Sequence, residues 1–161
     1  MAFYVHTDIE TTDDGDLVID EIGDISVASP LKTATQAINN IILTNKGELL
    51  TDTAFGANLQ QFYGNRNSRE ARALMERQIE AEVQRQALLD LSDVSIDVIA
   101  VDVSDAAIIV NVRGAFVDTT TGNLGGIVQP DDGVEMGYLY PFASHTITKI
   151  SDSNLLDATN F

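Results

Sequence analysis

Apolar residues recur at helical spacing in two segments of the chain. The first segment begins at Ser29 and Pro30, which predict an N-cap followed by a proline in the first turn. Its apolar stripe consists of Leu31, Ala34, Ile38, Ile41 and Ile42. Gly47 is expected just past the end of this helix. The second segment follows a cap at Asn67 or Ser68, and its stripe has i, i+4 spacing at Ala71, Met75, Ile79, Val83 and Ala87. Each helix is therefore expected to bury one face.

Alternating apolar and polar residues predict strands on both sides of these helices. Residues 16–26 alternate around a glycine, which predicts a strand, a turn and a short strand entered through the turn at Asp14 and Gly15. Residues 94–103 and 106–116 flank Ser104 and Asp105, which predicts a β-hairpin. A short helix is expected over residues 57–63.

The order of these elements predicts an α+β domain. We expect a small, mainly antiparallel sheet with the two main helices packed on one of its faces. This domain is expected to span residues 1–117. Residues 118–161 are rich in Gly, Thr and Asp and carry only short apolar patches, so they are predicted to form a less stable C-terminal extension whose role the pattern does not indicate.

Composition and charge narrow the possible partners. A chain of 161 residues with 44% hydrophobic content is long enough for one domain with a real core. Its formal net charge of -16 argues against nucleic acid, because phosphate binding needs clustered Lys and Arg. The lack of cysteine is consistent with a reducing compartment. No segment approaches the about 20 apolar residues of a membrane span, so a soluble protein with no membrane partner is expected.

Catalytic motifs are scarce. His6 and His145 lie far apart in the sequence without neighbouring ligands, so neither a metal site nor a cofactor is expected. One enzymatic alternative remains, because two carboxylates suffice for glycoside hydrolysis. Glu21 and Glu48 have apolar neighbours in the sequence, a setting that raises the pKa of a carboxyl group toward use as a general acid. With 25 acidic residues in the chain, this signal has little specificity.

The stretch "LTNKGELLTDTAFGANL", residues 43–59, contains two turns without any nucleophile. Gly47 is predicted to allow a left-handed exit from the first helix, and Phe55 to hold the loop against the core. The stretch resembles the gene-twenty-five-like family of baseplate wedge subunits in contractile-tailed phages, once labelled tail lysozyme and related to subunits of contractile secretion systems. The residues that carry the resemblance are Leu43, Thr44, Gly47, Glu48, Phe55, Gly56 and Leu59. The resemblance extends over residues 15–116, because the strand pattern before the first helix, the long helix and the hairpin follow in the order typical of the family.

The resemblance implies a structural, non-enzymatic protein of the virion, assembled in the host cytoplasm. It implies six copies at the tail baseplate, with other wedge proteins, the tail sheath protein and the tail tube or hub as partners. It further implies that arms of sheath subunits add strands to the sheet of this protein. We expect the hairpin to supply the open edge, with docking candidates at Ile108, Val110, Val112 and Arg113.

The chain departs from the family at one place. Many members carry Glu-Pro-Arg between the long helix and the hairpin, where it contacts the helical bundle that ties a wedge together. Asp93, Val94 and Ser95 occupy that position here, so this contact is lost or is made differently. Two alternatives to a structural role stay open from the sequence: a peptidoglycan-hydrolysing tail lysozyme, and an acidic chaperone or inhibitor that binds a basic partner in solution.

Overall fold

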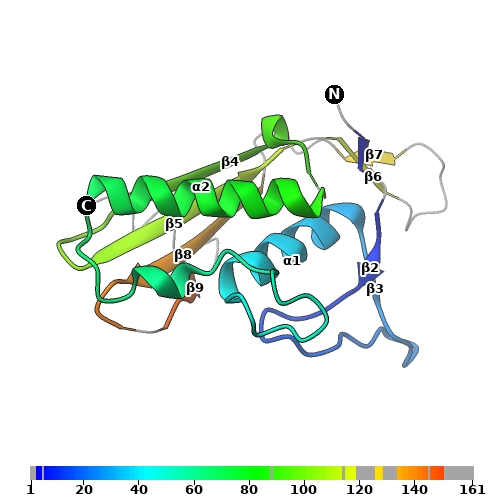
Figure 1. Cartoon of the computed structure of the whole chain (residues 1–161). Helices are drawn as coiled ribbons and strands as arrows, with labels where there is room; N and C mark the ends of the chain where they lie inside the picture. Colours follow the sequence, from blue (N-terminus) through cyan, green and yellow to red (C-terminus); the bar gives the residue numbers. More distant parts are fainter. Residues whose placement is uncertain are drawn as a thin grey trace.

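The protein has the predicted α+β architecture, seen in a computed structural model that describes residues 3–4, 6–87, 89–113, 115–118, 126–128, 134–144 and 146–150. Two helices, α1 (Pro30–Leu43) and α2 (Arg69–Gln86), lie on the same side of a four-stranded antiparallel sheet (Figure 1). The sheet order is β4 (Val94–Ala100), β5 (Asp105–Val112), β8 (Val134–Pro141) and β9 (Thr148–Ile150). A second, three-stranded sheet consists of β1 (Phe3–Tyr4), β6 (Ala115–Asp118) and β7 (Gly126–Val128). A third, two-stranded sheet consists of β2 (Asp8–Ile9) and β3 (Val27–Ala28).

Local sequence signals set the starts of both helices. Ser29 caps α1 by accepting a hydrogen bond from the Lys32 N–H, and Pro30 occupies the first turn. Ser68 caps α2 by accepting from the Ala71 N–H at 3.1 Å. The predicted stripe of α2 is buried except at its last member. Ala87 is exposed and ends the helix in a left-handed conformation, with φ of 52°, so its inclusion in the stripe was wrong.

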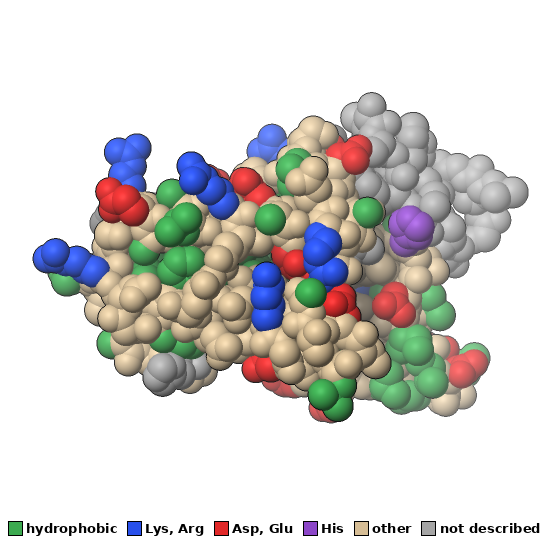
Figure 2. Space-filling model, viewed as in Figure 1, with side chains coloured by type: hydrophobic (Ala, Val, Ile, Leu, Met, Phe, Trp, Pro, Cys, Tyr) green, Lys and Arg blue, Asp and Glu red, His purple; other side chains and the backbone are tan. Residues whose placement is uncertain are grey.

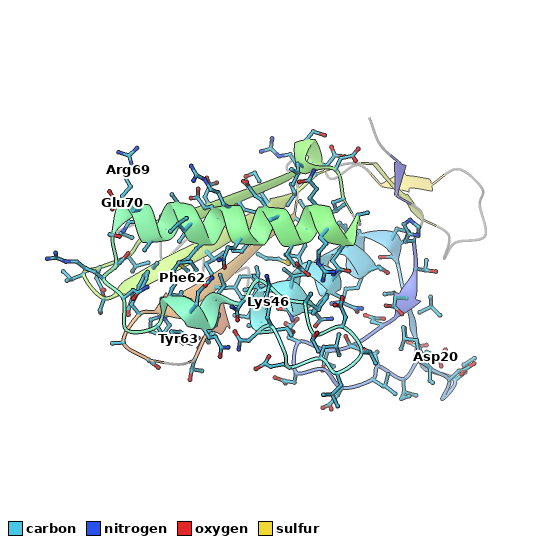
Figure 3. The ribbon with its side chains drawn as sticks, in the orientation of Figure 1. Asp20, Lys46, Phe62, Tyr63, Arg69 and Glu70 are labelled. Carbon is cyan, nitrogen blue, oxygen red and sulfur yellow. The ribbon has the colours of Figure 1, made fainter. Side chains whose placement is uncertain are left out.

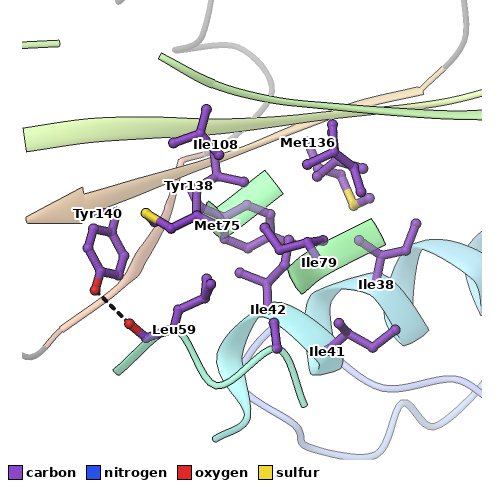
Figure 4. Close-up of a cluster of buried hydrophobic side chains, with 14 of the residues drawn as sticks. Ile38, Ile41, Ile42, Leu59, Met75, Ile79, Ile108, Met136, Tyr138 and Tyr140 are labelled. Carbon is purple, nitrogen blue, oxygen red and sulfur yellow. Dashed lines mark hydrogen bonds between the residues drawn. The ribbon is translucent and has the colours of Figure 1, made fainter. Parts of the chain in front are cut away.

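The core lies between the helices and one face of the large sheet (Figure 4). Side chains of β4 and β5 alternate, so that Ile96, Val98, Ile108 and Val110 face the helices. Two buried tyrosines of β8 complete this face. The Tyr138 hydroxyl contacts Asn39 Oδ1 at 2.9 Å, and the Tyr140 hydroxyl donates to the Leu59 carbonyl at 2.7 Å.

The place of β8 changes the predicted domain organisation. This strand comes from the segment expected to be a C-terminal extension, yet it pairs along its whole length with β5. Tyr138 and Tyr140 are fully buried, and Phe142 stacks edge-on against Tyr140. The boundary predicted after Val117 therefore separates strands that share one core. Within residues 118–161, residues 119–125, 129–133, 145 and 151–161 lie outside the described residues.

Candidate functional site

The corner formed by residues 43–59 folds back on the end of α1. The helix ends at Leu43, and Thr44 leaves it in an extended conformation, with its N–H bonded to the Asn40 carbonyl at 3.0 Å. Further along, the Ala57 N–H donates to the Ile41 carbonyl at 2.9 Å. The corner thus supplies partners to carbonyl groups that a helix C-terminus leaves without intrahelical bonds.

Gly47 does not form the predicted helix exit. It has a φ of +90°, but it lies three residues beyond the cap, in the turn of residues 45–48, and its N–H donates to the Thr53 carbonyl at 2.9 Å. Glu48 closes that turn, because its carboxylate accepts from the Asn45 backbone N–H at 2.8 Å and from the Asn45 amide at 3.1 Å. A glycine is still favoured here for its positive φ, though not as the C-cap.

Gly56 is the tightest point of the corner. It has a φ of +107°, and a Cβ on it would lie 2.8 Å from the Thr44 carbonyl carbon and closer still to the oxygen. Its N–H donates to Glu82 Oε1 of α2 at 3.2 Å. The close approach of the two backbone segments and the positive φ both disfavour a side chain, which explains the glycine at position 56.

A buried carboxylate joins the corner to α2. Glu82 is 5% exposed, and it accepts hydrogen bonds from Gly56, from the Gln86 amide and from the Arg85 guanidinium at 3.0 and 2.8 Å. Burial raises the pKa of Glu82, but the hydrogen bonds from Arg85, Gln86 and Gly56, together with the positive charge of Arg85, outweigh it and leave the pKa lowered. Arg85 also pairs with Asp52 of the corner at 3.1 Å.

Sequence reasoning missed Glu82, since a carboxylate on a charged helix is expected in water. Its position carried a signal nonetheless. Glu82 lies three residues after Ile79 and next to Val83, so helical geometry places it beside the buried stripe.

The predicted corner residues divide between the core and the surface. Leu59 and Gly56 are buried and Phe55 packs against the core, whereas Leu43, Gly47 and Glu48 are exposed, with Thr44 between these limits. Leu59 belongs to a 3₁₀ helix, Leu59–Phe62, shorter than predicted. Glu21 is exposed like Glu48, so neither of the two carboxylates proposed for catalysis lies in the apolar setting that the sequence suggested.

Among the described residues, the edge strands of the large sheet are β4 and β9, and not β5, which carried the docking candidates. Since β5 lies between β4 and β8, its backbone groups bond on both sides. Ile108, Val110 and Val112 are fully buried on the core face, and only Arg113, which follows the strand, is exposed. β5 therefore has no free edge to which a further strand could be added, whereas β4 of the same hairpin is an edge strand.

A side chain of α2 covers part of this edge. The Val98 N–H points away from β5 and donates to Glu76 Oε1 at 2.9 Å. Backbone groups alternate along a strand, so the N–H groups of Ile96 and Ala100 point to the same outer side.

Beside the edge runs a groove of about 470 Å³ between α2 and β4, lined by Arg69, Arg72, Ala73, Glu76, Val98, Ile99 and Ala100. Arg69 projects from the N-terminal end of α2 (Figure 3). The walls are tied together at this end, because the Asn67 amide donates to the carbonyls of Asp102 and Asp105, each at 2.9 Å. The groove is therefore held between two elements of fixed spacing.

The wedge-bundle candidates lie at the start of β4. Asp93 is partly exposed and its carbonyl accepts from the Arg113 N–H at 2.6 Å, while Val94 is buried and Ser95 is exposed. Their exposed surface is thus limited to parts of Asp93 and Ser95, which precede the groove-lining residue Val98 along the chain.

No protein-family model matches the chain, and comparison with curated proteins gives no significant match. Among the described residues, no group of His, Asp and Glu is arranged to hold a metal ion. Within the same residues, neither helix is long and apolar enough to cross a membrane.

Proposed function

We propose that this protein is a structural subunit of the baseplate wedge in a contractile phage tail or tail-like particle. Two features support the proposal: the resemblance of residues 15–116 to the wedge family, and the presence of a sheet edge beside a groove. The second feature carries it, because a strand edge with space alongside is what strand addition from a sheath arm requires. The partners are then other wedge proteins, the sheath protein and the tail tube or hub, with six copies in each particle.

Strand addition at β4 starts with the displacement of Glu76. The incoming strand lies in the groove, and one of its carbonyl groups accepts from the Val98 N–H in place of the carboxylate. Backbone bonds of this kind supply affinity that does not depend on the partner's side chains. Glu76 thereby protects the edge until the partner arrives, in the way that charged side chains discourage edge-to-edge aggregation.

The wedge assignment is tested by mass spectrometry of intact particles. We expect to detect this chain in purified baseplates at six copies in each particle. Its absence from particles, together with salt-dependent binding to a basic protein in solution, would favour the chaperone alternative.

The site of strand addition is tested by filling the groove from the helix side. Ala73→Trp on α2 places a large ring between the walls, whereas Leu74→Trp alters the neighbouring exposed position, which does not line the groove. We expect sheath growth from baseplates to stop with the first variant and to continue with the second, while both keep the wild-type melting temperature within a few degrees. If baseplates with Ala73→Trp still grow normal sheaths, strand addition does not take place at β4.

The enzymatic alternative has a direct test. Both Glu48 carboxylate oxygens are engaged by Asn45, which is a turn-stabilising arrangement. We therefore expect no clearing band in zymography on peptidoglycan. A band that disappears with Glu48→Gln would replace the structural assignment by a hydrolase.

A further inference from the structure

The N-terminal arm, residues 8–28, closes on itself. Three short segments meet at Glu10, Val18 and Ser26, whose backbones bond in a ring: Glu10 donates to Ser26 at 2.9 Å, Ser26 to Val18 at 2.9 Å, and Val18 to Glu10 at 3.1 Å. Each segment therefore pairs with both others, through β2 and β3 and through bridges joining residues 11 with 17 and 19 with 25. Because every segment already has two neighbours, the arm interacts through side chains and not by adding a strand.

One turn of the arm is anchored to the domain and the other projects from it. The Gln36 side chain of α1 accepts from the Thr11 N–H at 3.0 Å and donates to the Ile9 carbonyl at 3.2 Å. Lys149 of β9 pairs with Asp13 at 2.7 Å. The turn of residues 20–24 points away from the domain, as the position of Asp20 shows (Figures 1 and 3). A surface on this arm is thus held in place before any partner binds, which lowers the entropy cost of binding.

The outer surface of the arm is unusually apolar. Six large aliphatic side chains are exposed within 19 residues: Ile9 at 46%, Leu17 at 55%, Ile19 at 55%, Ile22 at 88%, Ile25 at 45% and Val27 at 59%. Apolar side chains gather over this arm at the lower right of the molecule (Figure 2). Single exposed aliphatic residues are ordinary, but a group on one small element marks an interaction surface.

The charge of the arm indicates what kind of partner binds this apolar surface. Residues 8–28 contain no Lys, Arg or His, and they carry eight acids: Asp8, Glu10, Asp13, Asp14, Asp16, Asp20, Glu21 and Asp24. A second copy of the chain would bring the same acidic surface, and an anionic membrane would repel it.

We infer that the arm docks onto another protein, at an apolar surface rimmed by Lys and Arg. The aliphatic side chains form the dry centre of the interface and the carboxylates meet the basic rim, which is the usual division of protein interfaces. The docking surface is distinct from the groove beside β4, and the inference does not depend on the wedge assignment.

The test uses the full chain and two synthetic amphipathic helical peptides. Both peptides carry the same leucine face, which one rims with Lys and the other with Glu. We expect the basic peptide alone to bind, with amide NMR shifts concentrated in residues 8–28. A variant with Ile19→Ser and Ile22→Ser is expected to lower the affinity at least 10-fold. The control Val103→Ser, which removes a 95% exposed side chain at the far end of the sheet, should change it less than 2-fold.

Several outcomes would overturn the inference. Binding of the basic peptide outside the arm, no binding, or equal binding of both peptides would each do so. An affinity unchanged by the two serine substitutions would show attraction by charge alone. Sedimentation that reveals dimers lost with Ile22→Ser would assign the surface to a second copy of the chain. Binding of the chain to anionic lipid vesicles, lost with the same variant, would assign it to a membrane surface.

Discussion

Gly56→Ala tests whether the corner is held by the close approach of two backbone segments. The added Cβ meets the Thr44 carbonyl, and the φ of +107° is one that L-residues rarely adopt. The corner has to shift to relieve this contact. The shift weakens two hydrogen bonds, from Gly56 to Glu82 and from Ala57 to the Ile41 carbonyl.

The expected cost follows from these parts. A non-glycine residue at strained positive φ costs about 1–2 kcal/mol. Loss of a hydrogen bond to a buried charged group adds about 1.5–3 kcal/mol. The alanine restricts the unfolded chain and returns about 0.4–1 kcal/mol. The free energy of unfolding should therefore fall by about 1.5–4.5 kcal/mol for Gly56→Ala.

Gly47→Ala is the matched control, measured with it by urea denaturation. Gly47 also has a positive φ, +90°, but a Cβ there meets nothing within 4 Å. Only the conformational strain applies, so we expect a loss of about 1 kcal/mol. Equal losses for the two variants, or a larger loss at Gly47, would refute the close-approach argument.

Three further predictions concern the core and its buried charge. Glu82→Gln should lower the free energy of unfolding by about 1–3 kcal/mol at neutral pH. Because the pKa of Glu82 is lowered in the folded protein, its contribution is complete above the unfolded value of about 4.3 and is lost as the pH falls below it, so the difference between wild type and variant should shrink in acid urea titrations. Tyr140→Phe leaves the Leu59 carbonyl without its donor and should cost about 1–3 kcal/mol in the same assay. A chain ending at residue 117 lacks β8 and should show no cooperative thermal transition by circular dichroism; a folded fragment would restore the predicted domain boundary.

The sequence by itself determined the elements whose causes are local. Ser29, Pro30 and Ser68 start the helices by bonding or packing within one turn, and the hairpin of β4 and β5 forms across a short connection. The α+β class follows from the order of such elements. The turn at Gly47 was also predictable as a turn, although its distance from the helix end was not, because helix ends vary by a few residues.

Only the tertiary structure decided which groups end up together. Pairing of β8 with β5 joins residues separated by a long stretch of chain, and no pattern around residues 134–141 distinguishes a central strand from a peripheral one. That pairing leaves β4 as the edge strand of the hairpin and moves the candidate docking site away from Ile108. The burial of Glu82 likewise depends on the corner that packs over it. The spacing of apolar residues specifies which face of a helix or strand is apolar. Which other element packs against that face depends on the packing of the whole chain.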